Sequence, residues 1–234
     1  EFTMFEAQIA YQDYQYGMDI FEKIFEYAAT HAIGTTSVMH GDVEIKLQTP
    51  WFRMSLVQAE KKIGGIDVLK WKTLSNAKDE LRPHLKDKKK QSDLAQLGTL
   101  GEVIAFAFEE LVEEKLIQPT IIYDYPVEVC PLAKKKASDP RFAERFEAFA
   151  LGSELGNNYS ELNDPEDLEK RFIEEKNKED LGFDEAHQTD NDYLEAVRHG
   201  MPPICGLGIG IDRMVMLLTG AHNIREVILF PTLR

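Results

Sequence analysis

The chain alternates between two hydrophobic patterns. A period of two, typical of strands with one buried face, marks four segments: residues 1–11, 36–46, 119–129 and 145–161. A period near 3.6, typical of helices with one apolar side, marks residues 16–30, 55–59, 100–111, 165–178, 190–200 and 212–218. We therefore expect a mixed fold of helices and strands, in a single domain that spans residues 1–234 without repeats or low-complexity linkers.

The segment at residues 145–161 predicts a hairpin with two carboxylates close together. Glu147 lies on its first strand, and Glu154 begins its second strand just after a tight turn. Neighbouring carboxylates repel each other unless a proton or cation lies between them, and Mg²⁺ favours oxygen ligands of this kind. The spacing is also compatible with two exposed glutamates on neighbouring strands, so both interpretations stay open.

The second strand of this hairpin carries further polar side chains. Asn157, Tyr159 and Glu161 share one face at a spacing of two. Glu154 is out of phase with them, which predicts a β-bulge near Gly156.

Residues 202–216, PPICGLGIGIDRMVM, contain the most informative pattern. Gly206, Gly208 and Gly210 occupy every second position of a predicted strand, so a flat ligand can lie on its bare face. Arg213 follows in the first helical turn, where the helix dipole disfavours a cation unless an anion such as phosphate binds there. Tight packing of a helix on the strand is the alternative explanation, but the arginine favours a nucleotide site.

Composition narrows the function classes. The net charge of −14 argues against nucleic-acid binding through overall charge, while the lysines of residues 86–90 form either a solvated face or a local binding surface. No segment approaches the about 18 apolar residues of a membrane span. Cys130 and Cys205 cannot form a disulfide scaffold, so we expect a cytoplasmic protein. The chain begins at Glu1 without a signal peptide, and we expect it to be part of a longer protein.

Four stretches together resemble the C-terminal part of the catalytic domain of class II lysyl-tRNA synthetases, and the resemblance covers nearly the whole chain. GLGIGIDRMVMLLTGAHNIREVILFP resembles motif 3 and the closing strand of the family, and SELGNNYSELNDP resembles its metal and lysine signature. QPTIIYDYPVEVCPLAKKK resembles the segment before that signature, and EFTMFEAQIAYQDY resembles the second strand of motif 2.

The resemblance implies a fold, a reaction and ligands. The fold is the α+β fold of class II aminoacyl-tRNA synthetases, an antiparallel sheet flanked by helices, here without its N-terminal portion. The reaction is a lysine–tRNA ligase reaction, in which ATP activates lysine to lysyl-adenylate and the lysyl group passes to tRNA(Lys). The implied cofactors are ATP and Mg²⁺.

The resemblance also implies a role for each candidate residue. Lysine would be bound by Glu6, Gln8, Asn157, Tyr159 and Glu161. ATP would be bound by Phe2, which stacks on adenine, and by Glu147, Glu154, Gly208, Gly210 and Arg213. Glu147 and Glu154 would hold Mg²⁺, and Arg213 would be the catalytic residue at the phosphate end of ATP.

The chain departs from the family pattern in several places. It has no counterpart of motif 1, of the first strand and loop of motif 2, or of the anticodon-binding domain. Since the resembled family dimerises through motif 1, we expect the longer parent enzyme to be a homodimer. We expect this chain, which lacks these parts, to be inactive by itself and to expose a sheet edge. Gln8 stands where the family usually has a tyrosine, and Ile204 and Cys205 replace smaller or more polar residues.

Two other functions remain compatible with the sequence. One is a lysyltransferase that acts on a protein, of the elongation-factor-P type. The other is a non-catalytic paralogue that binds lysine or a nucleotide.

Overall fold

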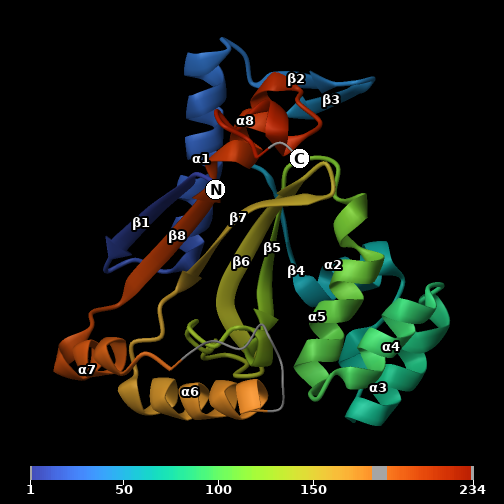
Figure 1. Cartoon of the computed structure of the whole chain (residues 1–234), viewed down its shortest axis with the longest axis vertical. Helices are drawn as coiled ribbons and strands as arrows, with labels where there is room; N and C mark the ends of the chain where they lie inside the picture. Colours follow the sequence, from blue (N-terminus) through green and yellow to red (C-terminus); the bar gives the residue numbers. More distant parts are fainter. Residues whose placement is uncertain (1, 181–188, 233–234) are drawn as a thin grey trace.

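A six-stranded sheet forms the centre of the computed structural model, which describes residues 2–180 and 189–232 (Figure 1). In spatial order its strands are β1 (Met4–Ala10), β8 (Ile204–Gly210), β7 (Ser153–Ser160), β6 (Phe142–Ala150), β5 (Thr120–Pro126) and β4 (Phe52–Ser55). All neighbouring strands are antiparallel except β4 and β5, which are parallel. A separate hairpin consists of β2 (Ser37–His40) and β3 (Val43–Lys46). The expected antiparallel sheet is confirmed, with one parallel pair at the β4 edge that the sequence pattern did not predict.

Eight α-helices lie in the described residues around this sheet. They are α1 (Tyr14–Ala32), α2 (Leu56–Ala59), α3 (Leu74–Leu81), α4 (Lys88–Gln96), α5 (Leu100–Leu111), α6 (Pro165–Asp180), α7 (Asn191–Gly200) and α8 (Ile211–Thr219). A π-helical turn at Glu60–Gly64 follows α2, and 3₁₀ turns occupy Val68–Lys70, Arg82–His84, Glu113–Lys115, Val127–Val129 and Ile224–Glu226. The helical predictions are confirmed, but α3 and α4 were missed because their segment is mostly polar. No helix of the described residues is long and apolar enough to cross a membrane.

Local capping determines where the main helices begin. At α1 the Asp13 side chain accepts hydrogen bonds from the backbone N–H groups of Gln15 and Tyr16. At α5 Thr99 and Glu102 form a capping box, with side chain to backbone distances of 3.1 and 2.9 Å. These caps place α1 and α5 against the sheet with their apolar sides inward.

Helix α1 covers one face of the sheet. Phe21 of α1 is fully buried and meets Phe146 of β6 edge-to-face, with ring centroids 5.7 Å apart. The helix lies so close to β7 that a Cβ atom on Gly17 would be 2.3 Å from the Asn158 side-chain oxygen. This close approach requires glycine, since any side chain there would push α1 off the sheet.

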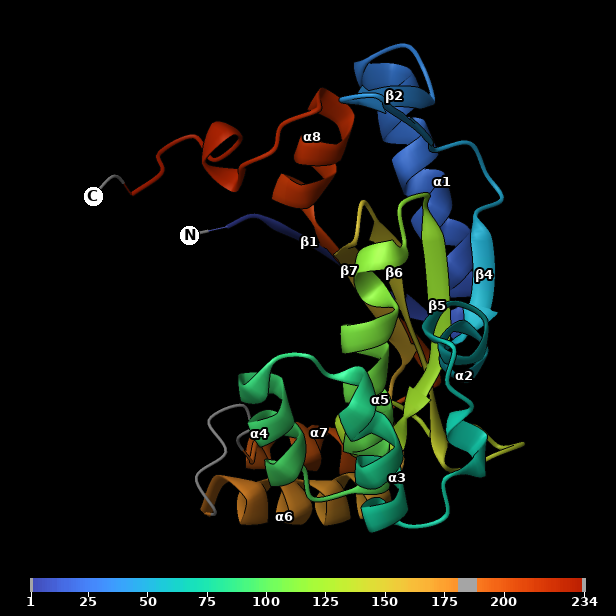
Figure 2. The same cartoon turned by 90° about the vertical axis from the view of Figure 1, so that its right-hand side faces the viewer.

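The opposite face of the sheet is more open. Helix α5 packs on the β5 side of it, over a second apolar core. Figure 2 shows that α4, α6, α7 and the segment after α8 extend outward on this side of the sheet, while α1 lies on the other. Strand β1 has one neighbour, β8, in the described part of the chain, so its other side is a free edge.

Candidate functional site

Strand register aligns the predicted site residues in rows on the open face. One row crosses β1, β8, β7 and β6 through Glu6, Gly208, Asn157 and Glu147. The next row crosses the same strands through Gln8, Gly206, Tyr159 and Arg145. Residues directly opposite each other on neighbouring strands point to the same face. The pattern of alternate polar positions therefore brings together side chains from four separate segments of the sequence.

A β-bulge brings Glu154 onto this face as well. Gly156 and Glu154 pair with consecutive residues of β6, which leaves Leu155 as the extra residue of β7. The bulge predicted near Gly156 is confirmed. Because of it, Glu154 faces the same side as Glu147 instead of the α1 core.

Glu161, just after β7, has an environment that suits a cation. It is 6% exposed, and a Cβ atom on Gly206 would lie 2.0 Å from its Oε1 atom, so the bare strand makes room for it. Burial raises the pKa of Glu161 to about 7, opposed by a hydrogen bond that Gln8 Nε2 donates at 3.2 Å. No Lys or Arg of the described residues forms an ion pair with it. A bound ammonium group would supply that missing charge.

Glu147 lies in a cavity of about 340 Å³ lined by residues of α5, β5, β6 and β7. Its two oxygens accept hydrogen bonds from Tyr125 Oη at 2.9 Å and from Arg145 Nη2 at 2.6 Å. Burial raises the pKa of Glu147, the Arg145 charge lowers it, and the Glu154 charge raises it further. The two predicted carboxylates thus face one cavity, with side-chain exposures of 16% and 33%.

Sequence reasoning missed four residues of this cavity. Glu109 reaches it from α5 and Glu113 from the 3₁₀ turn that follows α5, and Tyr125 and Arg145 hold Glu147. Burial and the neighbouring acids raise the pKa of Glu109 to about 7. The spacing of four residues between these two acids was a usable signal, but it does not reveal which element they pack against.

Glu147 and Glu154 suit a metal ion that is coordinated partly by a bound ligand, rather than one coordinated by protein side chains alone. Among the described residues, no group of three or more His, Cys, Asp or Glu side chains is arranged to hold a metal ion. Mg²⁺ commonly takes one or two carboxylates and completes its shell with water and phosphate oxygens. Glu147 and Glu154 supply such a pair, and Asn157 Nδ2 orients Glu154 at 3.2 Å.

A second cavity, of about 300 Å³, adjoins the carboxylates along the glycine strand. Phe2, Gly208, Gly210 and Arg213 all line it. A Cβ atom on Gly208 would meet nothing closer than a methionine methyl at 3.7 Å, so this stretch of strand is an open platform. Phe2 is 70% exposed at the side of this cavity.

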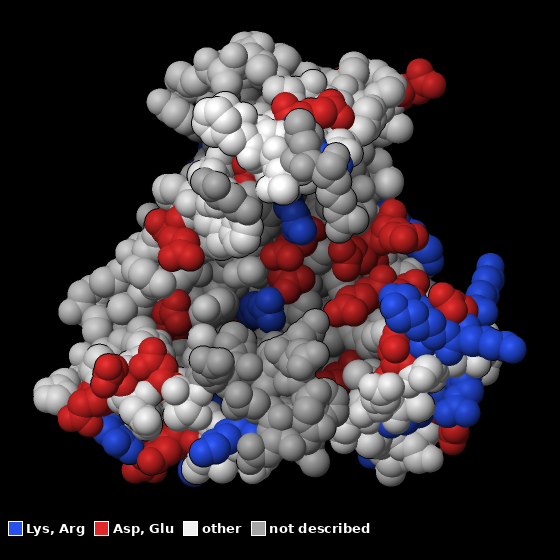
Figure 3. Space-filling view, in the orientation of Figure 1, with Lys and Arg blue, Asp and Glu red and all other residues white. Residues whose placement is uncertain are grey.

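Arg213 is the third residue of α8 and is half exposed. Its Nη1 atom donates to the backbone carbonyl of Glu154 and lies 3.7 Å from the Oε2 atom of the same residue. The guanidinium group is thus held in the second cavity beside Glu154, which lines both cavities. Figure 3, which views this face, shows basic and acidic side chains next to each other near its centre.

The arrangement pairs two complementary kinds of binding. The glycine platform and an aromatic side chain suit a flat base, and a guanidinium beside paired carboxylates suits a polyphosphate with its cation. The buried carboxylate of Glu161 lies beside Gly206, two residues along β8 from Gly208 of this platform, and suits an ammonium group. Glu6 and Gln8 reach the same face from β1, where both are exposed.

Comparison with known proteins adds an independent finding. The family model described as tRNA synthetases class II (D, K and N) matches residues 1–234. The lysine–tRNA ligase of Thermoanaerobacter sp. (strain X514) is 46% identical over 235 residues, which is 100% of this chain and 46% of that protein. The lysine–tRNA ligase of Bacillus subtilis (strain 168) is 44% identical over 234 residues, again 100% of this chain and 46% of the relative. The chain therefore spans about half the length of the curated relatives that it matches.

Proposed function

This chain belongs to the class II tRNA synthetases (D, K and N), and from that premise we propose that it is the C-terminal part of a lysine–tRNA ligase catalytic domain. We assign residues 1–234 to this one domain. The observation that carries the choice of lysine is Glu161, a buried carboxylate without a cation partner in the described chain, placed beside the glycine strand. Relatives named lysine–tRNA ligase support the same choice.

In this proposal the lysine pocket lies at the Gln8 row of the open face. The ε-ammonium group binds Glu161 and Glu6, and Gln8, Asn157 and Tyr159 line the pocket around its chain. Glu161 must be ionised to bind a cation, so its hydrogen bond from Gln8 favours the binding form.

The ATP site lies on the glycine platform. Phe2 stacks on adenine, Gly208 and Gly210 leave room for the nucleotide, and Arg213 binds the phosphate end. Glu147 and Glu154 would hold Mg²⁺, which would neutralise phosphate charge when bound. Tyr125 and Arg145 keep the Glu147 carboxylate in place.

The reaction then needs position and charge rather than a protein nucleophile. A lysine carboxylate oxygen attacks the α-phosphorus of ATP, the bond to the bridging oxygen breaks, and pyrophosphate leaves with lysyl-adenylate formed. The terminal hydroxyl of tRNA(Lys) next attacks the lysyl carbonyl carbon, and AMP leaves as the hydroxyl proton is lost. Holding the two reactants in line supplies much of the rate. We place the enzyme in the cytoplasm and expect the full-length protein to be a homodimer.

ATP–pyrophosphate exchange with each of the twenty amino acids tests this proposal, on this chain and on the full-length gene product. Exchange by the full-length protein with lysine alone supports the ligase, and activity confined to the longer protein assigns essential groups to residues outside this chain. Exchange with another amino acid overturns the lysine assignment.

Two further outcomes separate the alternative functions. Lysine-dependent exchange followed by transfer to a protein instead of tRNA identifies a protein lysyltransferase. Tight lysine or ATP binding without any exchange identifies a non-catalytic paralogue. Both transfers are followed with radiolabelled lysine in the same samples.

A further inference from the structure

We propose that the helical group of residues 60–98 binds RNA through one exposed basic surface. This surface consists of the side chains of Arg82, His84, Lys86, Lys88 and Lys89, all of which are exposed. They lie in the 3₁₀ turn after α3, in the short loop that follows it and in the first turn of α4. The inference rests on the proposed function and deepens it, because it names where the tRNA substrate contacts this chain.

Charge is segregated along the chain. Residues 60–98 contain ten Lys and Arg against six Asp and Glu, whereas the rest of the chain contains 17 against 35. Glu60, one of the six acids, is fully buried and adds nothing to the outer surface. Figure 3 shows this gathering of basic side chains over the region where Figure 1 draws α3 and α4. A polyanion is attracted here even though the protein as a whole is acidic.

The first turn of α4 carries a surplus of positive charge, although the Asp87 side chain caps the helix by accepting a hydrogen bond from the Lys89 backbone N–H. It begins with three consecutive lysines, residues 88–90, where the positive end of the helix dipole favours acids. Lys90 is neutralised by Glu110 of α5 at 2.5 Å, but Lys88 and Lys89 have no acidic partner in the described part of the chain. A phosphate backbone against this turn would reduce the mutual repulsion of these lysines.

The basic surface is joined to the active-site cavity through a single helix. Lys90 packs over the ring of Phe106 of α5, 6.0 Å from its centroid, and pairs with Glu110 of the same helix. Glu109 of α5, and Glu113 of the 3₁₀ turn after it, line the cavity that holds Glu147. Figure 2 shows α4 extending on the open side of the sheet. An RNA strand that follows α4 can therefore place its end over this face without crossing the α1 side.

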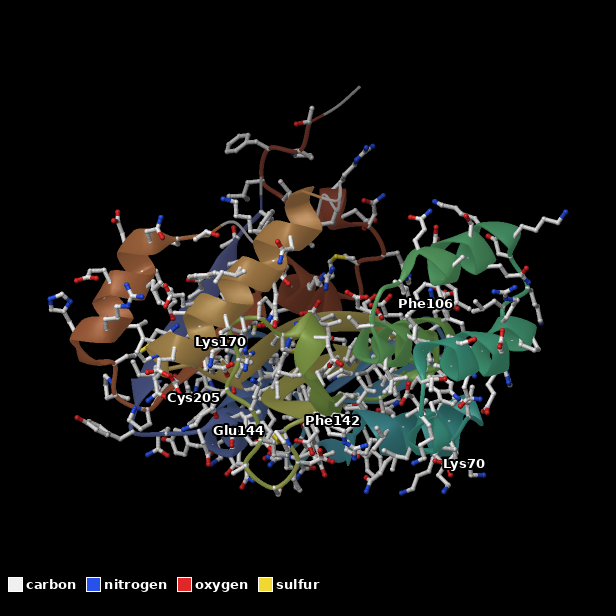
Figure 4. All side chains as sticks on the ribbon, turned by 90° about the horizontal axis from the view of Figure 1, so that it is seen from below. Lys70, Phe106, Phe142, Glu144, Lys170 and Cys205 are labelled. Carbon is white, nitrogen blue, oxygen red and sulfur yellow. The ribbon has the colours of Figure 1, made fainter. Side chains whose placement is uncertain are left out.

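A charge-matched pair of variants in the full-length gene product tests the surface. The test variant carries Lys86→Gln, Lys88→Gln and Lys89→Gln. The control carries Lys23→Gln, Lys46→Gln and Lys170→Gln, which change the net charge equally outside residues 60–98. Figure 4 shows Lys170 on α6, apart from the helical group to which the labelled Lys70 belongs.

The measurement is affinity for a tRNA(Lys) transcript over a range of salt concentrations, with lysine-dependent exchange measured beside it. We expect the test variant to bind about tenfold more weakly at about 100 mM salt, and its salt slope to fall by about two to three. We expect the control to stay within about twofold of the unsubstituted protein. The loss should appear in RNA binding and not in amino-acid activation, which uses no tRNA.

Equal losses in both variants, or no loss in the test variant, overturn the surface. Hydrogen exchange on the unsubstituted protein gives an answer that does not depend on the variant folding: bound tRNA should protect residues 82–96, and absence of protection there rejects the inference. If the unsubstituted protein shows no lysine-dependent exchange, the proposed ligase function fails, while the RNA-binding comparison still decides this surface.

Discussion

The two faces of the central sheet are built from alternate residues of the same strands. One face is packed with apolar side chains, and the other carries polar residues and glycines. On the face covered by α1, Phe146, Leu207 and Ile209 are buried among apolar side chains. On the open face, neighbours in the same strands are Glu147 and Gly208, one a carboxylate with a raised pKa and the other without a side chain. One strand thus contributes to folding with one set of residues and to the site with the other.

The difference shows that the requirements of folding alone explain the residues of only one face. Burial of apolar area contributes roughly 25 cal/mol per Å², and the α1 face collects this gain from a mostly apolar lining. The open face holds the carboxylates of Glu147 and Glu161, whose pKa values burial raises, so their ionised forms are disfavoured in the free protein. Buried carboxylates that cost stability, one of which (Glu147) faces a cavity, are explained by a ligand that the fold is arranged to bind.

The largest effect is expected from a substitution that disrupts the packing of the α1 face and leaves the open face unchanged. Phe146→Ala removes a fully buried ring that contacts Phe21, and we expect it to lower the free energy of unfolding by about 3–5 kcal/mol. Tyr159→Phe is the control on the open face and should change stability by less than about 1 kcal/mol. Urea unfolding of both variants checks this, and equal destabilisation would contradict the division between the faces.

The second prediction concerns Glu161 and pH. Its folded pKa of about 7 lies above the ordinary 4.5, so folding takes up a proton between these values. Stability of the unliganded protein should fall as pH rises through this window. Glu161→Gln should remove part of this pH dependence, and Glu109, whose pKa is also raised to about 7, should account for part of what remains. Melting temperature measured from about pH 4.5 to 8 tests the sign.

Lysine binding should show the opposite trend. A cation requires the ionised carboxylate, so affinity should rise with pH up to about 7 and then level off. Glu161→Gln should weaken lysine binding by about a hundredfold at pH 8, because it leaves a buried ammonium group unpaired. Calorimetry with the full-length protein measures both, and a variant with unchanged affinity would move the lysine pocket elsewhere.

The fourth prediction sharpens the contrast within the glycine strand. A Cβ atom at Gly206 would lie 2.0 Å from Glu161 Oε1, whereas one at Gly208 would have 3.7 Å to its nearest neighbour. Gly206→Ala should therefore raise the KM for lysine about tenfold by displacing the carboxylate. Gly208→Ala should leave lysine binding nearly unchanged and raise the KM for ATP instead. If both variants affected only ATP, Glu161 would not face the lysine pocket.

The contrast between faces also explains what the sequence could predict. A period of two reveals which residues share a face, so the alignment of Asn157, Tyr159 and the glycines follows from local pattern alone. The bulge that turns Glu154 toward Glu147 was also predictable, because a phase change within one strand is a local signal.

Long-range packing set the limit of prediction. Glu109 of α5 and Glu113 of the turn after it join the cavity only because this segment packs beside β5 and β6, and nothing local to either residue indicates that partner. Pairing of β4 with β5 was missed for the same reason, since parallel neighbours far apart in sequence leave no turn signal. Helices α3 and α4 were missed because their polar composition hides a weak apolar side.

The smallest expected effect concerns Gln8, which stands at a position where the resembled family usually has a tyrosine. Its Nε2 atom donates one hydrogen bond to Glu161 at 3.2 Å, and this contact lowers the pKa of Glu161 against the larger effect of burial. Gln8→Ala should therefore raise the pH midpoint of lysine binding by less than about one unit, since one such bond contributes about 0.5–1.5 kcal/mol.

At pH 8 the same variant should bind lysine within about tenfold of the unsubstituted protein, because Glu161 is already largely ionised there. Gln8→Glu is the informative companion, since a second carboxylate beside Glu161 should raise the midpoint further by repulsion. A midpoint that moves down in Gln8→Ala would mean that the amide stabilises the protonated carboxyl. In that case Gln8 would oppose cation binding, and selectivity for lysine would have to come from Glu6 and the walls of the pocket.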